Sequence, residues 1–116
     1  MKTWMPVAKT EDFATNSGEC VLVGDKQIAI FNFNRTEWYA VQNRCPHWGQ
    51  MVLSRGIIGS QNGERKIACP LHKNSYSLVT GEHMGGNSNW NLETYEVKVE
   101  EGTLYIYTAV EESAFV

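Results

Sequence analysis

Apolar and polar residues alternate with a period of two along several short segments of the chain, and no stretch keeps the helical period over three turns. A period of two is typical of β-strands, whose successive side chains point to opposite faces of a sheet. The alternation is clearest where charged residues separate Tyr95, Val97 and Val99. The pattern predicts strands over residues 20–23, 27–33, 38–41, 95–99 and 104–107, with weaker candidates at 66–69 and 75–79.

Two-residue turns join some of these strands into hairpins. Gly24-Asp25 lies between the first two strands and Glu101-Gly102 lies between the last two, and such pairs favour the tight turns of β-hairpins. The one helical signal is a single turn at residues 10–13. Short strands separated by turns predict an all-β fold, built as an antiparallel sandwich or open barrel.

Glycine, proline and histidine gather in the middle of the chain. Residues 43–91 contain seven of the ten glycines, two of the three prolines and all three histidines. We expect this part to be a loop-rich subdomain that carries the functional site, mounted on the sheet formed by the flanking segments. The length of 116 residues fits one domain over residues 1–116, with a loosely held tail at 111–116.

The charge and the apolar runs of the chain exclude several kinds of partner. Ten Lys and Arg against thirteen Asp and Glu give a formal charge of −3, and the charges are spread without a basic stripe, so nucleic-acid binding is not expected. No apolar run approaches the roughly 20 residues of a membrane helix. Residues 1–10 lack the apolar stretch of a secretory signal. We therefore expect a cytoplasmic protein with no membrane partner.

The three cysteines are an odd number in a chain without an export signal. This favours reduced thiols over a disulfide framework. Cys20 has no ligand spacing to another residue, and we expect it to be a small buried thiol in an apolar strand. Cys45 and Cys69, in contrast, each lie close to a histidine.

These cysteines form two loops with mixed metal-ligand character. The first loop reads Cys45-Pro46-His47, and after 21 residues the second reads Cys69-Pro70-Leu71-His72. A thiolate with an imidazole suits iron or zinc. Structural zinc sites usually carry like ligands on each loop, whereas mixed loops suit a metal pair with unlike ends. A [2Fe-2S] cluster with two cysteines on one iron and two histidines on the other has this character. A mononuclear zinc site remains the alternative.

The sequence around these loops resembles the Rieske family. Residues 69–82 read CPLHKNSYSLVTGE and are similar to the whole second ligand loop of that family, with its following hairpin. Residues 52–59 read VLSRGIIG and are most similar to the family of small subunits of assimilatory NAD(P)H-dependent nitrite reductases. The resemblance implies a Rieske-like fold and a Rieske [2Fe-2S] cluster. The implied cofactor and metal ligands are Cys45, His47, Cys69 and His72.

The resemblance also implies a function. The protein would be an electron-transfer subunit without a catalytic residue of its own, and its partner would be a large subunit with flavin and sirohaem that reduces nitrite to ammonia. The surface around His47, Trp48 and His72 would then be exposed and partly apolar for docking. One alternative is a Rieske ferredoxin that feeds an aromatic-ring oxygenase, but those ferredoxins usually carry a proline-containing loop that residues 81–100 lack. The other alternative is a zinc-stabilised interaction module.

Three further residues near the loops carry weaker predictions. His83 is interpreted as a solvated loop residue rather than a fifth ligand. Tyr76 either donates a hydrogen bond to a sulfur atom or only packs. Trp48 either covers the cluster or fills the core.

Overall fold

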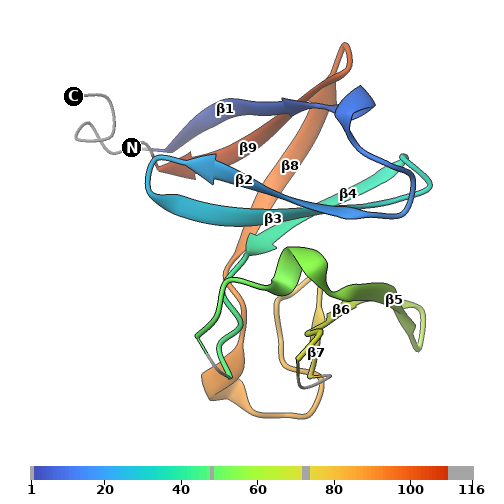
Figure 1. Cartoon of the computed structure of the whole chain (residues 1–116), viewed down its shortest axis with the longest axis vertical. Coiled ribbons are helices and arrows are strands. Elements are labelled where there is room, and N and C mark those ends of the chain that lie inside the picture. Colours follow the sequence, from blue (N-terminus) through green and yellow to red (C-terminus); the bar gives the residue numbers. More distant parts are fainter. Residues whose placement is uncertain (1, 48, 72–73, 110–116) are drawn as a thin grey trace.

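Antiparallel strands and short 3-10 turns make up the computed structural model, which describes residues 2–47, 49–71 and 74–109 (Figure 1). The strands are β1 (Lys2–Lys9), β2 (Gly18–Val23), β3 (Lys26–Phe33), β4 (Glu37–Gln42), β5 (Ile57–Gln61), β6 (Glu64–Ala68), β7 (Ser75–Ser77), β8 (Thr94–Glu100) and β9 (Thr103–Ala109). The 3-10 turns are η1 (Thr10–Asp12), η2 (Leu53–Arg55) and η3 (Ser88–Trp90). The prediction of an all-β antiparallel fold is confirmed. None of the helical segments in the described part is long and apolar enough to cross a membrane.

The strands form two sheets. The large sheet has six strands in the order β1-β9-β8-β4-β3-β2, and the small sheet has the order β5-β6-β7. Figure 1 shows the small sheet below the large one, beside the loops that follow β4 and precede β8. These loops and the small sheet come from the glycine-rich middle of the chain.

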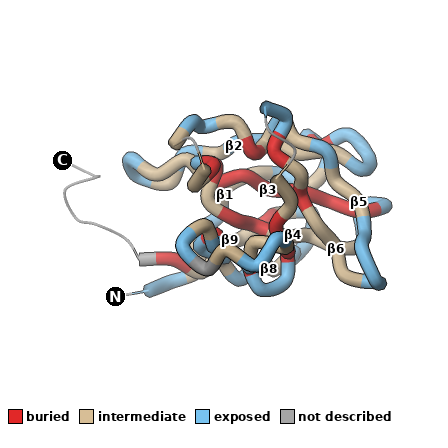
Figure 2. Tube along the Cα trace, turned by 90° about the horizontal axis from the view of Figure 1, so that it is seen from below, coloured by how far each residue is buried: buried red, intermediate tan, exposed pale blue. Residues whose placement is uncertain are grey.

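Strand β3 is buried along residues 28–33 and separates two apolar cores (Figure 2). Because its side chains alternate in direction, Ile28 and Ile30 join one core with residues of β4 and β9. Ala29, Phe31 and Phe33 join the other core, which reaches down to the small sheet and its loops. We call this second core the lower core, and it also contains Cys45 and Cys69. Strand β3 of the large sheet therefore also packs against the residues of the candidate site.

The two predicted hairpins are confirmed. Val23 pairs with Lys26 across the first turn and Glu100 pairs with Thr103 across the second. Glu101 and Gly102 both have positive φ angles, of 51° and 79°, as a type I′ turn requires. The helical signal at residues 10–13 is a single 3-10 turn, η1, without a side-chain cap.

Two strands carry no clear sequence signal. In β1 the register with β9 shifts between Pro6 and Ala8, and a proline is tolerated there because β1 is an edge strand. The bulge breaks the period of two on which the prediction depends. Strand β5 is short and contains Gly59, a residue that is depleted in strands.

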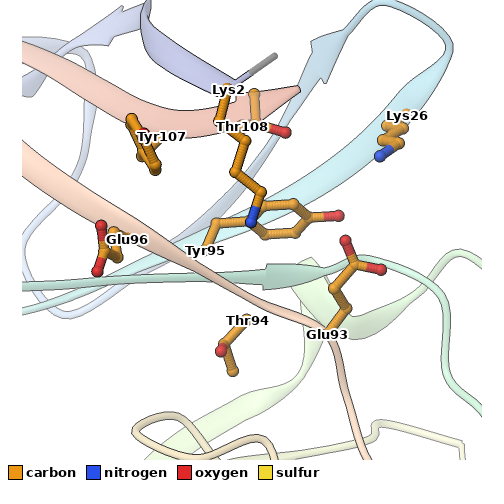
Figure 3. A pocket seen from close by; sticks show the side chains of 8 residues that line it. All are labelled: Lys2, Lys26, Glu93, Thr94, Tyr95, Glu96, Tyr107 and Thr108. Carbon is orange, nitrogen blue, oxygen red and sulfur yellow. The ribbon is translucent and has the colours of Figure 1, made fainter. Parts of the chain in front are cut away.

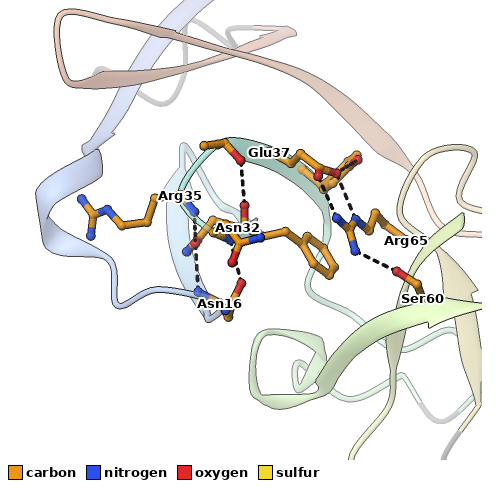
Figure 4. A network of polar contacts seen from close by, with 10 residues as sticks. Asn16, Asn32, Arg35, Glu37, Ser60 and Arg65 are labelled. Atoms are coloured by element: carbon orange, nitrogen blue, oxygen red, sulfur yellow. Dashed lines mark hydrogen bonds and ion pairs between the residues drawn. The ribbon is translucent and has the colours of Figure 1, made fainter. Parts of the chain in front are cut away.

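An arginine of the small sheet is bound to the large sheet at Glu37 (Figure 4). Arg65 donates from Nε and Nη2 to the two carboxylate oxygens of Glu37, at 3.0 and 2.7 Å, and from Nη1 to Ser60 Oγ at 2.9 Å. Its guanidinium lies over the ring of Phe33, 4.2 Å from the centroid. The hydrogen bonds from Arg65 and Tyr39 lower the pKa of Glu37 to about 2. This bidentate contact ties β4 to β6 beside the lower core.

A hollow of about 480 Å³ lies beside the start of β8 (Figure 3). Lys2, Lys26 and Glu93 surround Tyr95 there, and burial followed by the hydrogen bond with Glu93 raises the pKa of the Tyr95 hydroxyl. Among the candidate metal ligands in the described part of the chain, Cys45, His47 and Cys69, none lines this hollow.

Candidate metal centre

The first ligand loop follows β4 and folds back on itself around Cys45. The Cys45 N–H donates to the Gln50 carbonyl at 2.8 Å, and the Gly49 N–H donates to the Cys45 carbonyl at 2.6 Å. Gly49 has a φ angle of +74°, which only glycine adopts without strain. Arg44 and Met51 close the loop as an isolated β-bridge. The loop thereby directs the Cys45 side chain into the core, where it has no exposed surface.

The second ligand loop connects β6 to β7. The Cys69 N–H donates to the Asn74 carbonyl at 2.8 Å, and the Cys69 side chain is buried in the same core as Cys45. Pro70 and Leu71 at the outer side of the loop are exposed. His72 lies outside the described residues, as do Trp48 and Lys73. The structure thus brings together two of the four predicted ligands, the thiols, in one buried cluster.

Tyr76 contacts the Cys45 thiol. Its hydroxyl lies 3.6 Å from Cys45 Sγ, and the whole side chain is buried. Burial, followed by the hydrogen bond with Cys45, raises the pKa of the Tyr76 hydroxyl. A hydroxyl that keeps its proton in this way donates to a thiolate. The two interpretations of Tyr76 therefore apply together, since it packs in the core and it lies within hydrogen-bonding reach of a sulfur.

The donor set in this region suits a group with soft ligands. Cys45 and Cys69 are reduced thiols, and the Nδ1 atom of His47 is buried. Across residues 2–47, 49–71 and 74–109, no group of three or more His, Cys, Asp or Glu side chains is placed to hold one ion. A two-iron cluster does not need such a group, because each iron takes two protein ligands. The described residues fit a [2Fe-2S] cluster in this respect.

The segment between β7 and β8 forms a third side of the centre that the sequence pattern did not indicate. The ring of Trp90 lies on the ring of His47, with centroids 4.4 Å apart and planes inclined by 57°. His83 contacts Trp90 edge to face at 5.1 Å and lies 5.4 Å from the ring of Tyr76. No residue spacing in this asparagine-rich and glycine-rich segment marks these contacts in advance.

The interpretation of His83 as a solvated loop residue was wrong. His83 is half-buried, and both ring nitrogens have hydrogen-bonding partners, Asn74 Oδ1 at 3.2 Å and the Asn87 N–H at 3.1 Å. Burial, together with the nearby charge of His47, lowers the pKa of His83. A β-bridge between His83 and Tyr76 pairs this segment with β7. A local sequence pattern does not predict such a contact.

The expectation that Cys20 is buried was also wrong. Cys20 is exposed on β2, and the Asn43 side-chain amide lies 3.5 Å from its sulfur. All four residues from Cys20 to Val23 are apolar, so alternation alone does not decide which face of the strand is buried. In the structure, Val21 and Val23 pack against the core that contains Ile28 and Ile30, which we call the upper core. The side chains of Cys20 and Leu22 therefore face the solvent.

Exposed apolar side chains lie on both ligand loops. Met51 is 47% exposed and Leu71 is 49% exposed. Of the residues expected to form the docking surface, His47 is half-buried, and Trp48 and His72 lie outside the described residues. The exposed apolar residues of the two loops are consistent with the expected docking surface, which itself stays a prediction.

Comparisons with known proteins agree with this geometry. The model of the Rieske-like [2Fe-2S] domain family matches residues 3–107. The chain is 33% identical to the NADH nitrite reductase small subunit of Escherichia coli K12 over 107 residues, which are 91% of this chain and 98% of the relative. The solution structure of that E. coli protein superposes with a TM-score of 0.84, over 94% of this chain and 99% of the other.

Two further relatives bear on the alternatives. The chain is 36% identical to the NAD(P)H nitrite reductase of Emericella nidulans over 113 residues, which are 90% of this chain and 10% of that much longer protein. It is 34% identical to a ferredoxin subunit of 3-phenylpropionate/cinnamic acid dioxygenase from Photorhabdus laumondii over 85 residues, which are 73% of this chain and 76% of the relative. The similarity to the nitrite reductase proteins thus extends over more of the chain.

Proposed function

Because the chain belongs to the family of Rieske-like [2Fe-2S] domains, we propose that it is the electron-transfer small subunit of an NAD(P)H-dependent nitrite reductase, which reduces nitrite to ammonia. The observation that carries this proposal is the similarity over 98% of the E. coli small subunit. It is one domain over residues 1–116, with a cluster-binding part over residues 43–91, and it works in the cytoplasm. The subunit has no catalytic residue of its own.

The proposed ligands are Cys45 and Cys69 on one iron and His47 and His72 on the other. When bound, the cluster supplies the transfer of a single electron. The buried thiols lie on the core side, where the lower core keeps water away from them. His47 is half-buried, with the Trp90 ring against it, and the exposed Met51 of the same loop supports the docking of a redox partner near the histidine side.

Tyr76 supports the cysteine side of the centre. Its hydroxyl lies 3.6 Å from Cys45 Sγ, and a ligating thiolate has no proton to donate, so the tyrosine hydroxyl is the donor when Cys45 binds the cluster. A hydrogen bond to a cluster sulfur or to a ligating thiolate stabilises the electron-rich, reduced state more than the oxidised one. Tyr76 therefore raises the reduction potential.

The proposed partner is the large subunit that holds flavin and sirohaem. In Emericella nidulans the matching segment is part of a single NAD(P)H nitrite reductase polypeptide, which supports a lasting association between the two parts. The exposed Met51 and Leu71 on the ligand loops supply apolar contact area for this docking.

A stand-alone Rieske ferredoxin for an aromatic-ring oxygenase is the second candidate. The similarity to the Photorhabdus ferredoxin subunit favours it. The lower coverage of that match and the lack of proline over residues 81–100 count against it.

The test combines cofactor analysis with reconstitution. We expect the purified protein to be red-brown and to contain iron and acid-labile sulfide in equal amounts. Zinc without sulfide would contradict the cluster. The protein is then added to the isolated large subunit, and nitrite reduction driven by NAD(P)H is measured beside a ring-oxygenase assay. Electron delivery to the oxygenase, without stimulation of nitrite reduction, would favour the ferredoxin instead.

A further inference from the structure

A continuous series of side-chain contacts leads from one proposed ligand to another. Tyr76 contacts Cys45, His83 contacts Tyr76, and Trp90 contacts both His83 and His47. We call Tyr76, His83 and Trp90 the aromatic bracket. The bracket connects the cysteine side of the centre with the histidine side through side chains alone.

His83 is fixed in the bracket through three hydrogen bonds. The Asn87 N–H donates to its Nδ1 at 3.1 Å, so the ring proton of the neutral imidazole is on Nε2, which donates to Asn74 Oδ1 at 3.2 Å. The His83 N–H also donates to Asn91 Oδ1 at 3.0 Å. A rotation of the ring would break both of its bonds, so the orientation of His83 is determined by its surroundings.

Trp90 is fixed by the short turn η3. The Asn87 side chain accepts a hydrogen bond from the backbone N–H of Asn89 at 3.0 Å, and the backbone carbonyl of Asn87 accepts one from the backbone N–H of Trp90 at 3.0 Å. The Trp90 ring packs against the lower core on one side and meets the His83 ring edge to face. These contacts fix the position of the Trp90 ring against the His47 ring.

We propose that His83 and Trp90 are positioning residues that fix the ring plane of His47 and shield the centre from water, an inference that rests on the proposed function. Groups that pack on a metal-ligating histidine control its orientation and the access of solvent, and through these the potential of the metal. Neither residue has a proposed contact with iron. Each acts through the His47 imidazole, Trp90 directly and His83 by holding Trp90.

The first test replaces Trp90 by leucine and compares it with Trp4→Leu. Trp4 lies on β1 of the large sheet, where it packs against Tyr107, and serves as the matched control. Because reduction adds a negative charge, greater access of water to the centre favours the reduced state. We expect Trp90→Leu to change the EPR g values of the reduced cluster and to raise the midpoint potential. The expected change in the reduction equilibrium is up to about tenfold, or about 59 mV for one electron.

The second test displaces His83. His83→Leu removes both ring hydrogen bonds and should change the EPR spectrum in the same sense as Trp90→Leu. His83→Gln retains a donor for Asn74 and an acceptor for the Asn87 N–H, so it should restore most of the native spectrum. A purely structural role would not predict this rescue in a spectroscopic property of the cluster.

The third test removes no side chain. A Cβ at Gly85 would lie 2.6 Å from the His83 ring, whereas a Cβ at Gly59 would meet only the end of the Lys66 side chain at 3.8 Å. Gly85→Ala should therefore displace the bracket, and Gly59→Ala should not. This variant decides the question if the leucine variants fail to load the cluster.

The outcomes separate this inference from the proposed function. A wild-type protein without a Rieske EPR signal contradicts the proposed function and the bracket with it. A wild-type signal that remains unchanged, together with an unchanged midpoint potential, in cluster-loaded Trp90→Leu or Gly85→Ala would overturn the positioning role while the proposed function stands. Altered signals in these variants, with native signals in Trp4→Leu and Gly59→Ala, support it.

Discussion

The large sheet and the cluster-binding part are stabilised in different ways. The upper core of the large sheet consists of aliphatic and aromatic side chains such as Ile28, Ile30 and Ile106. The lower core mixes such residues with two thiols and the Tyr76 hydroxyl, and it is enclosed by loops rather than by a continuous sheet. The upper core contains no proposed ligand, whereas the lower core contains the two thiols of the proposed ligand set, so only the second part should gain stability when the cluster binds.

The largest expected effect separates the buried thiols from the exposed one. Cys45→Ser and Cys69→Ser should abolish the cluster, because each removes a thiolate from the cysteine side of the centre. Cys20→Ser, which changes an exposed thiol on β2, should retain it. Iron and sulfide analysis measures the difference. A cluster that survives in Cys45→Ser would refute the ligand assignment.

A matched pair of core substitutions compares the two parts directly. Ile30 and Ile67 are both fully buried, one in each core. Each change to alanine should lower the free energy of unfolding by about 2–5 kcal/mol, measured by urea denaturation. Only Ile67→Ala should also accelerate the loss of the cluster on incubation. Equal rates of loss in both variants would mean that the two cores are not distinct in this respect.

The Tyr76 hydroxyl contributes a smaller effect, limited to the cluster. Tyr76→Phe removes the hydrogen bond to Cys45 and should lower the midpoint potential by about 59 mV, which corresponds to about 1.4 kcal/mol for one electron. Tyr39→Phe is the control, since the Tyr39 hydroxyl contacts Glu37 at 3.0 Å and no sulfur. Equal midpoint potentials in both variants would mean that the hydrogen bond from Tyr76 does not affect the reduction potential.

The ion pair between the two sheets should give the smallest effect. The folded-state pKa of Glu37 is about 2, below its ordinary value of 4.5, so the pair contributes stability above pH 4.5 that is lost as the pH falls toward 2. Glu37→Gln should therefore differ from the wild type in Tm at pH 6 and approach it at pH 2–3. The exposure of both partners keeps this difference small.

Glu100→Gln is the control for the ion pair, because its salt bridge with Lys98 lies within β8 and joins no two sheets. A pH dependence that is the same in both variants would mean that the contact between the sheets adds nothing beyond surface charge.

The sequence determined the local elements and the residue types of the proposed ligand loops. The alternation around Val97 and the Gly24-Asp25 turn depend on neighbours a few residues apart, and these elements formed as expected. The two mixed loops with Cys45 and Cys69 were equally evident, since the spacing of metal ligands is a property of short segments.

The tertiary structure decided which distant residues meet. The pairing of β1 with β9 joins the two ends of the described chain. The burial of Cys45 beside Tyr76 joins the loop after β4 to strand β7, and the contact of Trp90 with His47 joins the same loop to the segment between β7 and β8. Cys20 is exposed because the opposite face of its all-apolar segment packs against a core. Such contacts arise from packing among segments far apart in the chain, and local alternation and spacing carry no information about them.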